Sequence, residues 1–266
     1  MPEYALELSE AELFRYQKMA ELALSTEREL WSAAGIVEGA GVADVGCGPG
    51  AVSVVLAQLV GPSGHVWAVD RDAEAREAAT AAATRAGVGN VTVGAGDAYD
   101  TGLAPGSVDV VMIRHVLAHN GGLEKAIVEH AATLVRPGGC VYLVDVEASS
   151  ARLRPADPDL EDLNARYVKW HALQGNDLSV GLRLDELLAG AGLEVVHFSG
   201  RYLIVEMMPG LRPPSWAARE AMVASGLATA DDVARWEAAL SRGGQASEPA
   251  TAFVPSFQAY GRRPAS

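Results

Sequence analysis

Short apolar runs alternate with helical segments between residues 41 and 146, and this alternation constrains the fold more than any other feature of the sequence. Each apolar run has the length and composition of a buried strand. The predicted strands are 41–46, 65–70, 90–97, 108–113 and 139–146, and the predicted helices between them are 50–60, 73–86 and 122–135. Strands connected through helices form a parallel sheet covered on both faces, so the sequence predicts an α/β fold with a doubly wound sheet.

The flanking segments add further helices and strands. Residues 9–34 are predicted to form one or two helices, with Ser9 as an N-cap. The elements predicted after the sheet are helices at 158–175 and 183–192, a strand at 193–208 with a bulge or bend at Ser199–Gly200, a helical pair at 215–242 and a last strand at 252–264. Pro255 would move that last strand toward an edge or distort its start, because proline lacks the N–H that a ladder needs.

Composition narrows the class of protein. The chain has 266 residues, is 49% hydrophobic and carries a formal net charge of −13. Such a charge disfavours binding to nucleic acids or anionic membranes and favours a small neutral or cationic substrate. Cys47 and Cys140 lie in apolar, glycine-rich segments and are expected to be buried thiols of a reduced cytoplasm. No signal peptide or membrane-length apolar run is recognised, so a soluble, cytoplasmic protein is expected.

The glycine-rich stretch VADVGCGPG (42–50) is the strongest functional signal. Glycines that follow a strand let the backbone approach a ligand, and the next helix offers free N–H groups. The G-x-G-x-G spacing differs from the G-x-G-x-x-G of dinucleotide enzymes, and Asp44 precedes it. Asp70 ends the second strand, where it could accept hydrogen bonds from a ribose, and Asp97 ends the third, where it could accept from an adenine amine. Each acid alone could instead cap a helix or turn.

The motifs DVGCGPG, VDRD, GDAYD and LVRPGGCVYLVDV together closely resemble the class I S-adenosylmethionine-dependent methyltransferases over residues 36–148. The resemblance implies S-adenosyl-L-methionine as cofactor, S-adenosyl-L-homocysteine as product, and a mostly parallel, Rossmann-like sheet of seven strands whose last strand, 252–264, is antiparallel. It divides the chain into a helical lid (1–35), a cofactor-binding core (36–148) and a remainder (149–266) with a lid insertion at 209–245. The implied cofactor residues are Asp44, Gly46, Cys47, Gly48, Gly50, Asp70, Arg71, Gly96, Asp97, Ala98, Arg114 and His115.

Ionisable side chains gather at the end of the fourth strand, in DVVMIRHVLAHN (109–120). The resemblance places this point beside the transferred methyl group. We expect His115 to act as a base, because an imidazole can take a proton at neutral pH. His119 would share its helical face or merely brace the turn, and Arg114 would neutralise the cofactor carboxylate or cap a helix. Tyr16 is expected over the cofactor, as a third catalytic candidate. No third ligand accompanies the histidines, so no metal is expected.

Aromatic and apolar side chains outside the core suggest walls for a flat organic substrate. The predicted substrate-binding residues are Trp31, Tyr167, Trp170, His171, Met207 and Trp216, with Met208 beside them. Their alternative role is to pack the lid onto the core.

The whole chain is similar to actinobacterial small-molecule methyltransferases of natural-product (secondary-metabolite) pathways. That similarity is compatible with C3-methylation of an indole or tryptophan-derived substrate, with O- or N-methylation of another aromatic metabolite as the alternative. A non-catalytic cofactor-binding protein and a nicotinamide oxidoreductase are the competing classes. A homodimer is compatible with the sequence, and a nucleic acid partner is not expected.

Overall fold

The computed structural model describes residues 10–207, 212–245 and 249–265. The strands are β1 (Gly41–Val45), β2 (His65–Asp70), β3 (Val91–Ala95), β4 (Val108–Arg114), β5 (Val135–Val146), β6 (Arg152–Arg154), β7 (Glu194–Glu206) and β8 (Thr251–Arg262). The helices are α1 (Glu10–Ala33), α2 (Ala51–Val60), α3 (Ala73–Ala86), α4 (Glu124–Leu134), α5 (Pro158–Leu173), α6 (Leu184–Gly190), α7 (Pro214–Ala217), α8 (Arg219–Ala224) and α9 (Ala230–Gln245). Three 3₁₀ turns are η1 (Leu117–His119), η2 (Ala148–Ser150) and η3 (Val180–Arg183).

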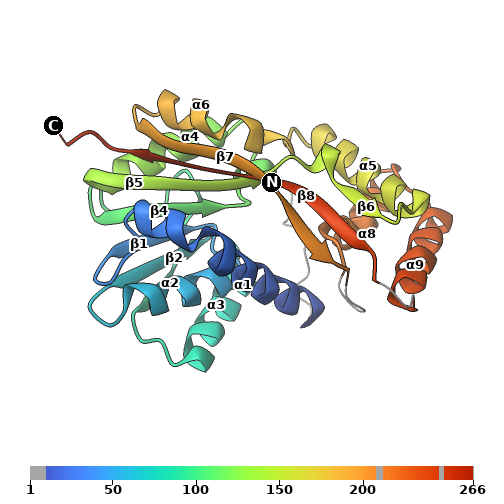
Figure 1. Ribbon diagram of the computed structural model, residues 1–266, viewed down its shortest axis with the longest axis horizontal. Coiled ribbons are helices and arrows are strands. Elements are labelled where there is room, and N and C mark those ends of the chain that lie inside the picture. The colour runs from blue at the N-terminus through green and yellow to red at the C-terminus, as the bar shows by residue number, and fades with distance from the viewer. Residues whose placement is uncertain (1–9, 208–211, 246–248, 266) are drawn as a thin grey trace.

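These strands form one sheet in the order β3-β2-β1-β4-β5-β8-β6, with β7 also paired to β8. Strands β1 to β5 are parallel, and β8 is antiparallel to β5, β6 and β7. Helices cover both faces, and separate apolar clusters fill the space on either side of the sheet (Figure 1). The predicted doubly wound α/β fold with an antiparallel last strand is confirmed, and the three-residue β6 is an addition to it.

Pro255 does not place β8 at an edge, contrary to the prediction. In an antiparallel pair the N–H and C=O of one residue point to the same neighbouring strand. The carbonyl of Pro255 accepts from the N–H of Glu147, just after β5 ends. Pro255 therefore lies where β8 changes its neighbour on this side. β5 pairs with β8 as far as Ser256, and β6 pairs with β8 from Phe253 toward its start. A proline is tolerated there because its missing N–H costs only the last bond of the β5–β8 ladder, at Glu147.

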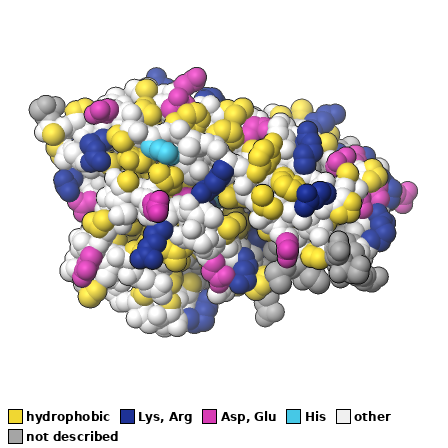
Figure 2. Space-filling model, viewed as in Figure 1, with side chains coloured by type: hydrophobic (Ala, Val, Ile, Leu, Met, Phe, Trp, Pro, Cys, Tyr) yellow, Lys and Arg dark blue, Asp and Glu magenta, His cyan; other side chains and the backbone are white. Residues whose placement is uncertain are grey.

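The irregularity of β7 also lies elsewhere than predicted. Its register shifts between Val195 and His197, and no shift occurs at Ser199–Gly200. Gly200 instead lies under a ring, because a Cβ at this position would be 2.5 Å from Cε1 of Phe257. The outward side chains of β7 include the exposed Tyr202, and apolar and charged side chains are mixed over the face seen in Figure 2.

Residues 9–34 contain one helix, α1, which agrees with the predicted one or two helices. The predicted pair at 215–242 instead consists of the three helices α7, α8 and α9. Ser9, the predicted N-cap, lies outside the described residues. Within the described part of the chain, each helix is too short or too polar to span a bilayer.

Candidate active site

A large cavity lies at the carboxyl ends of the parallel strands, where ligands of such sheets bind. Its volume is about 1330 Å³, whereas a pocket for one small ligand usually measures roughly 300–1,000 Å³. The loops after β1 to β5 form one side, and α1, α5, β7 and β8 contribute the others. The cavity therefore has room for two ligands side by side.

The loop after β1 exposes its backbone to this cavity at Gly46 and Gly48. Their φ angles are 73° and 53°, in the region that glycine adopts most easily. A Cβ on Gly46 would lie 2.4 Å from Cγ2 of Val116, and one on Gly48 would lie 3.7 Å from the ring of Tyr16. Tyr16 thus covers the loop from α1. The bare backbone and the side chain of Cys47 between the glycines form the wall.

Gly50 has a packing role instead of a place in the cavity wall. A Cβ on this residue would lie 2.8 Å from the Cα of Ala79, which belongs to α3. Its φ of 77° begins α2. The glycine lets α2 and α3 approach each other closely, and unlike Gly46 and Gly48 it does not line the cavity.

Asp70 shapes the glycine loop and faces the cavity. Its Oδ2 accepts from the N–H of Gly48 at 2.8 Å, and its Oδ1 accepts from the N–H of Asp72 at 2.9 Å. A carboxylate has about four acceptor positions, so both oxygens keep capacity for hydroxyl donors of a ligand. Asp97, after β3, also lines the cavity, and its backbone is paired with that of Asp100.

Asp44 is the buried acid of the cavity. Its residue is 2% exposed, and Oγ of Ser53 donates to its Oδ2 at 2.5 Å. Burial raises the pKa of Asp44 to about 6, against the lowering effects of Ser53 and Arg114. A cation bound beside this carboxyl would replace some of the lost hydration and favour its charged form. Burial and the neighbouring Asp44 also raise the pKa of Cys47, so that thiol stays protonated.

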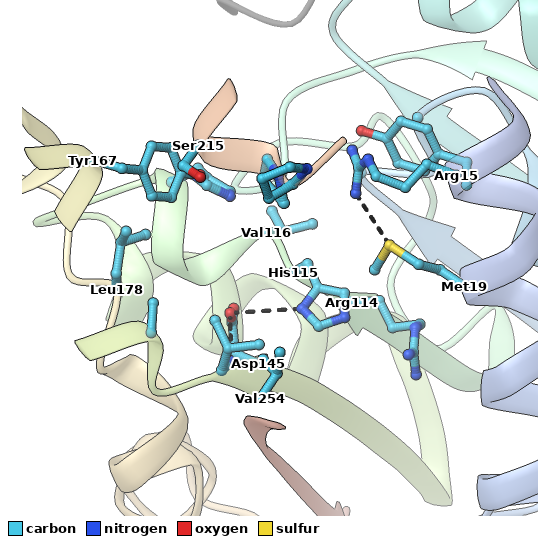
Figure 3. A pocket seen from close by; sticks show the side chains of 18 of the residues that line it. Arg15, Met19, Arg114, His115, Val116, Asp145, Tyr167, Leu178, Ser215 and Val254 are labelled. Atoms are coloured by element: carbon cyan, nitrogen blue, oxygen red, sulfur yellow. Dashed lines mark hydrogen bonds and ion pairs between the residues drawn. The ribbon is translucent and has the colours of Figure 1, made fainter. Parts of the chain in front are cut away.

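His115 has an unusual backbone and an unpaired ring nitrogen. Among the described residues it is the non-glycine residue with a positive φ, 54°. Its Nδ1 lies 3.9 Å from Oδ1 of Asp145, too far for a hydrogen bond but close enough for charge attraction. Its Nε2 is buried and has no hydrogen-bond partner. Figure 3 shows the ring between Asp145 and Arg114, with Val116 and Arg15 above it.

Asp145 fixes the turn that follows His115. Its Oδ2 accepts from the N–H of Ala118 at 3.1 Å, and its Oδ1 accepts from the N–H of Val146 at 3.0 Å. Because Asp145 holds the chain in the short turn η1, no helix runs from His115 to His119. The prediction that one helical face carries both rings therefore does not hold.

His119 belongs to an aromatic cluster that attaches α5 to this turn. Its ring centroid is 4.9 Å from that of His171, whose Nδ1 pairs with the amide of Asn176. Tyr167 and Trp170 contact His171 at 4.5 and 4.7 Å. Burial lowers the pKa of both histidines, to about 3 for His171. His119 and Tyr167 line the cavity, whereas Trp170 and His171 do not.

Arg114 lines the cavity but is held by a carboxylate of α1 that the sequence reasoning missed. Its guanidinium is 2.7 Å from Oε2 of Glu27, which is 1% exposed. Tyr142 and Trp31 donate to the same oxygen, and Arg201 of β7 lies 3.5 Å from the other one. Glu27 thus joins α1 to three strands. Its signal in the sequence is a lone acid on the apolar side of the first helix.

The remaining predicted substrate residues divide between wall and core. Met207 lines the cavity, and Met208 lies outside the described residues. Trp31 is fully buried between α1 and the sheet, so it cannot touch a ligand. Trp216 does not line the cavity either, because its ring packs against two guanidinium groups, those of Arg212 and Arg219.

In all, the predicted residues that line the cavity are Tyr16, Asp44, Gly46, Cys47, Gly48, Asp70, Arg71, Gly96, Asp97, Ala98, Arg114, His115, His119, Tyr167 and Met207. The sequence reasoning missed wall residues from segments without motifs: Arg15 and Met19 on α1, Arg152 on β6, Leu203 and Val205 on β7, and Val254 on β8. Within the described residues, no three His, Cys, Asp or Glu side chains are grouped to hold a metal ion.

These residues fit S-adenosylmethionine by three observations. The backbone of Gly46 and Gly48 lines the cavity, acids lie at the carboxyl ends of β1 and β2 beside it, and a buried imidazole nitrogen lacks a partner. Asp70 has acceptor capacity for ribose hydroxyls, and Asp44 is placed where an ammonium group would be favoured.

Comparisons with known proteins show the family of the chain. The model of the family described as "Methyltransferase domain" matches residues 36–182, more than half of the chain. The chain therefore belongs to this family.

Individual relatives are similar over shorter regions. An arsenite methyltransferase of Aquipseudomonas alcaligenes is 38% identical over 42% of the chain and 34% of its own length. A nocamycin O-methyltransferase of Saccharothrix syringae is 38% identical over 40% of the chain and 37% of its own length. The chain thus spans little more than a third of each. A putative methyltransferase of Bacillus halodurans shares the fold, with a TM-score of 0.58, 20% identity, and coverage of 90% of this chain and 99% of that one.

Proposed function

We propose that the chain transfers the methyl group of S-adenosylmethionine to a small, largely apolar metabolite, with His115 as the base. One observation carries the proposal: the buried Nε2 of His115 lacks a partner in a cavity that also contains the glycine loop. A buried nitrogen without a partner costs stability, so a site that keeps one has a use for it.

The cofactor, when bound, supplies an electrophilic methyl group, so the chain has to position a nucleophile and accept its proton. The backbone at Gly46 and Gly48, with Asp44, Asp70 and Asp97, would hold the cofactor. Asp145 beside Nδ1 favours the tautomer with its proton there, which leaves the Nε2 lone pair for the substrate. After proton transfer, the same carboxylate stabilises the imidazolium by charge attraction.

The substrate class we favour is an indole or tryptophan-derived natural product methylated at C3. In C3-methylation the base removes the indole N–H proton as C3 attacks the methyl group, and a hydroxyl or an amine likewise loses one proton on methylation. O- or N-methylation of another aromatic metabolite therefore needs the same base. Apolar wall residues such as Leu203, Val205 and Val254 support a flat organic substrate. The nocamycin O-methyltransferase, by its name, acts on a natural product, which supports this substrate class.

Two measurements test the proposal. Calorimetry should show that S-adenosylmethionine and S-adenosylhomocysteine bind with micromolar dissociation constants, and absence of binding by both would end it. A mass-spectrometric screen of indoles, phenols and aromatic amines with the purified protein and cofactor should reveal a product that has gained one methyl group. Cofactor binding without turnover of any compound would instead favour a non-catalytic cofactor-binding protein.

A further inference from the structure

The charged residues of the cavity wall are distributed unevenly among its segments. Around the glycine loop the wall contains mostly acids: Asp44, Asp70, Asp72, Glu74 and Asp97, with Arg71 as the cation. The side built by α1, the segment 148–168 and the segment 203–254 has mostly cations: Arg15, Lys18, Arg152 and Arg212, with Glu161 as the acid among its described wall residues. Leu203, Val205 and Val254, which the proposed function assigns to the substrate, belong to the same segment of the wall as Arg212.

Two of these cations are already neutralised. Arg15 pairs with Glu12 at 2.6 Å, and Lys18 pairs with Glu21 at 2.7 Å. These pairs orient the side chains of α1 without leaving a net charge in the wall.

Arg152 and Arg212 have no carboxylate partner among the described residues. Arg152 donates to the carbonyl oxygens of Ser149 and Ala151 at 3.0 and 2.8 Å, which position the guanidinium but do not neutralise it. Arg212 lies 5.0 Å over the ring of Trp216, a contact that also leaves its charge in place. Among the described residues, two guanidinium groups of the wall, one of them on the exposed Arg152, thus have no carboxylate to compensate them, in a chain with a net charge of −13.

Apolar side chains adjoin these cations. Leu153 follows Arg152 in the wall, and Leu160, Val205 and Val254 complete an apolar surface on the same side. A guanidinium presents a rigid fork of donors that matches the oxygens of a carboxylate or a phosphate. We propose that the substrate is an apolar molecule with an anionic group, a carboxylate or phosphate, and that Arg152 and Arg212 bind this group. The inference rests on the proposed function and replaces the neutral or cationic substrate expected from net charge.

In this arrangement Trp216 supports one of the two arginines. It does not line the cavity, but its ring supports Arg212, which does. Arg219 contacts the same ring at 4.7 Å, donates to the carbonyl of Trp216 and pairs with Glu220, and it lies outside the wall. The chain therefore offers a matched control: two arginines on one tryptophan, of which one faces the cavity.

The experiment uses two fluorescent probes with the same apolar body, 8-anilinonaphthalene-1-sulfonate, which is anionic, and N-phenyl-1-naphthylamine, which is neutral. Each is titrated into the full chain saturated with S-adenosylhomocysteine. We expect the Arg152→Gln/Arg212→Gln variant to bind the anionic probe about tenfold more weakly, with an unchanged affinity for the neutral probe. Arg219→Gln should change neither. Displacement of the anionic probe by indole-3-acetate and by phenyl phosphate distinguishes a carboxylate from a phosphate.

Equal effects on both probes, or no effect of the double variant on the anionic one, would overturn the proposal. An unchanged thermal midpoint and an unchanged affinity for S-adenosylhomocysteine show that the variants are folded. If the wild-type chain fails to bind S-adenosylhomocysteine, the proposed function fails, whereas the two probes, titrated without it, still report on the arginines.

Discussion

At the scale of single residues, the strained backbone of His115 provides a clean way to test its role. Asparagine tolerates a positive φ better than most residues do, so His115→Asn removes the imidazole and keeps the turn. If His115 is the base, kcat should fall about 100- to 10,000-fold while the dissociation constant of S-adenosylhomocysteine stays within twofold. Steady-state kinetics and calorimetry measure the two quantities.

The half-buried His65, which bonds Thr92 and does not line the cavity, is the control: His65→Asn should leave kcat unchanged. Wild-type turnover in His115→Asn would exclude the histidine as the base.

Residues tied to a local motif could be placed from the sequence, and residues placed by packing could not. Gly46, Gly48 and Asp70 lie at the cavity because a strand, a turn and a helix fix their positions within a few residues. Trp31 was assigned to the substrate because of its chemistry, but the rotation of α1 turns it into the core. Gly50 belongs to the same motif, yet its neighbour Ala79 comes from another helix, which local spacing does not reveal.

At the scale of elements, Glu27 determines how α1 is attached. Glu27→Gln removes the charge that neutralises the buried Arg114, so we expect the free energy of unfolding to fall by about 2–4 kcal/mol. Hydrogen exchange should also quicken in residues 12–24, which reach from the Glu27 anchor over the cavity. Glu21→Gln breaks an exposed pair on the same helix and should cost less than about 1 kcal/mol. If chemical denaturation showed equal losses of unfolding free energy for Glu27→Gln and Glu21→Gln, the anchoring role of Glu27 would be contradicted.

The approach of α2 to α3 gives a second test at this scale. Gly50→Ala introduces both a positive-φ strain and a Cβ that meets the backbone of Ala79, so we expect a loss of about 3 kcal/mol or more in unfolding free energy. Gly87→Ala has a similar φ of 66° but open space around its Cβ, and it should lose about 1–2 kcal/mol. The difference between the two denaturation midpoints isolates the clash, and similar midpoints would show that α3 shifts to relieve it.

The elements themselves were largely predictable because strand composition and glycine positions are local signals. The helices of the 215–242 segment and the interior position of β8 were not. Pro255 is normally a sign of an edge, and its N–H side falls in the break between β5 and β6, which only the assembled sheet defines.

At the scale of the whole molecule, buried titratable groups determine how stability depends on pH. His119 and His171 have lowered pKa values, so the unfolded chain takes up their protons first, and stability is lost as pH falls below about 6.5. Asp44 has a pKa raised to about 6. Its contribution to stability is therefore fully present below pH 3.8 and is lost as the pH rises through about 6. Acid should therefore destabilise the chain, with Asp44 opposing part of the loss.

Asp44→Asn separates these contributions. The variant should be more stable than the wild type at pH 8, by roughly 1–3 kcal/mol, because no carboxylate has to be charged in a buried place. Its stability should fall more steeply between pH 6 and 4, and it should bind S-adenosylmethionine more weakly. Denaturation curves at pH 8, 6 and 4 would show this, and identical pH profiles of variant and wild type would contradict the assignment.

The net charge shows why the class of substrate was harder to predict from the whole sequence than the fold. A total of −13 suggested a neutral or cationic substrate, but the acids and cations of the cavity wall are distributed unevenly among its segments. A sum over the chain carries no information on that distribution.

The position of β8 has a consequence for how the molecule is assembled. It is the last strand in the sequence, and it is the neighbour of β5, β6 and β7 at once. During synthesis, β5 keeps a bare edge and β7 has no strand to join until residues 251–262 leave the ribosome. The part of the cavity wall formed by β6, β7 and β8 is therefore completed only after residues 251–262 have been synthesised, and a nascent chain halted before that point has the glycine loop without this wall.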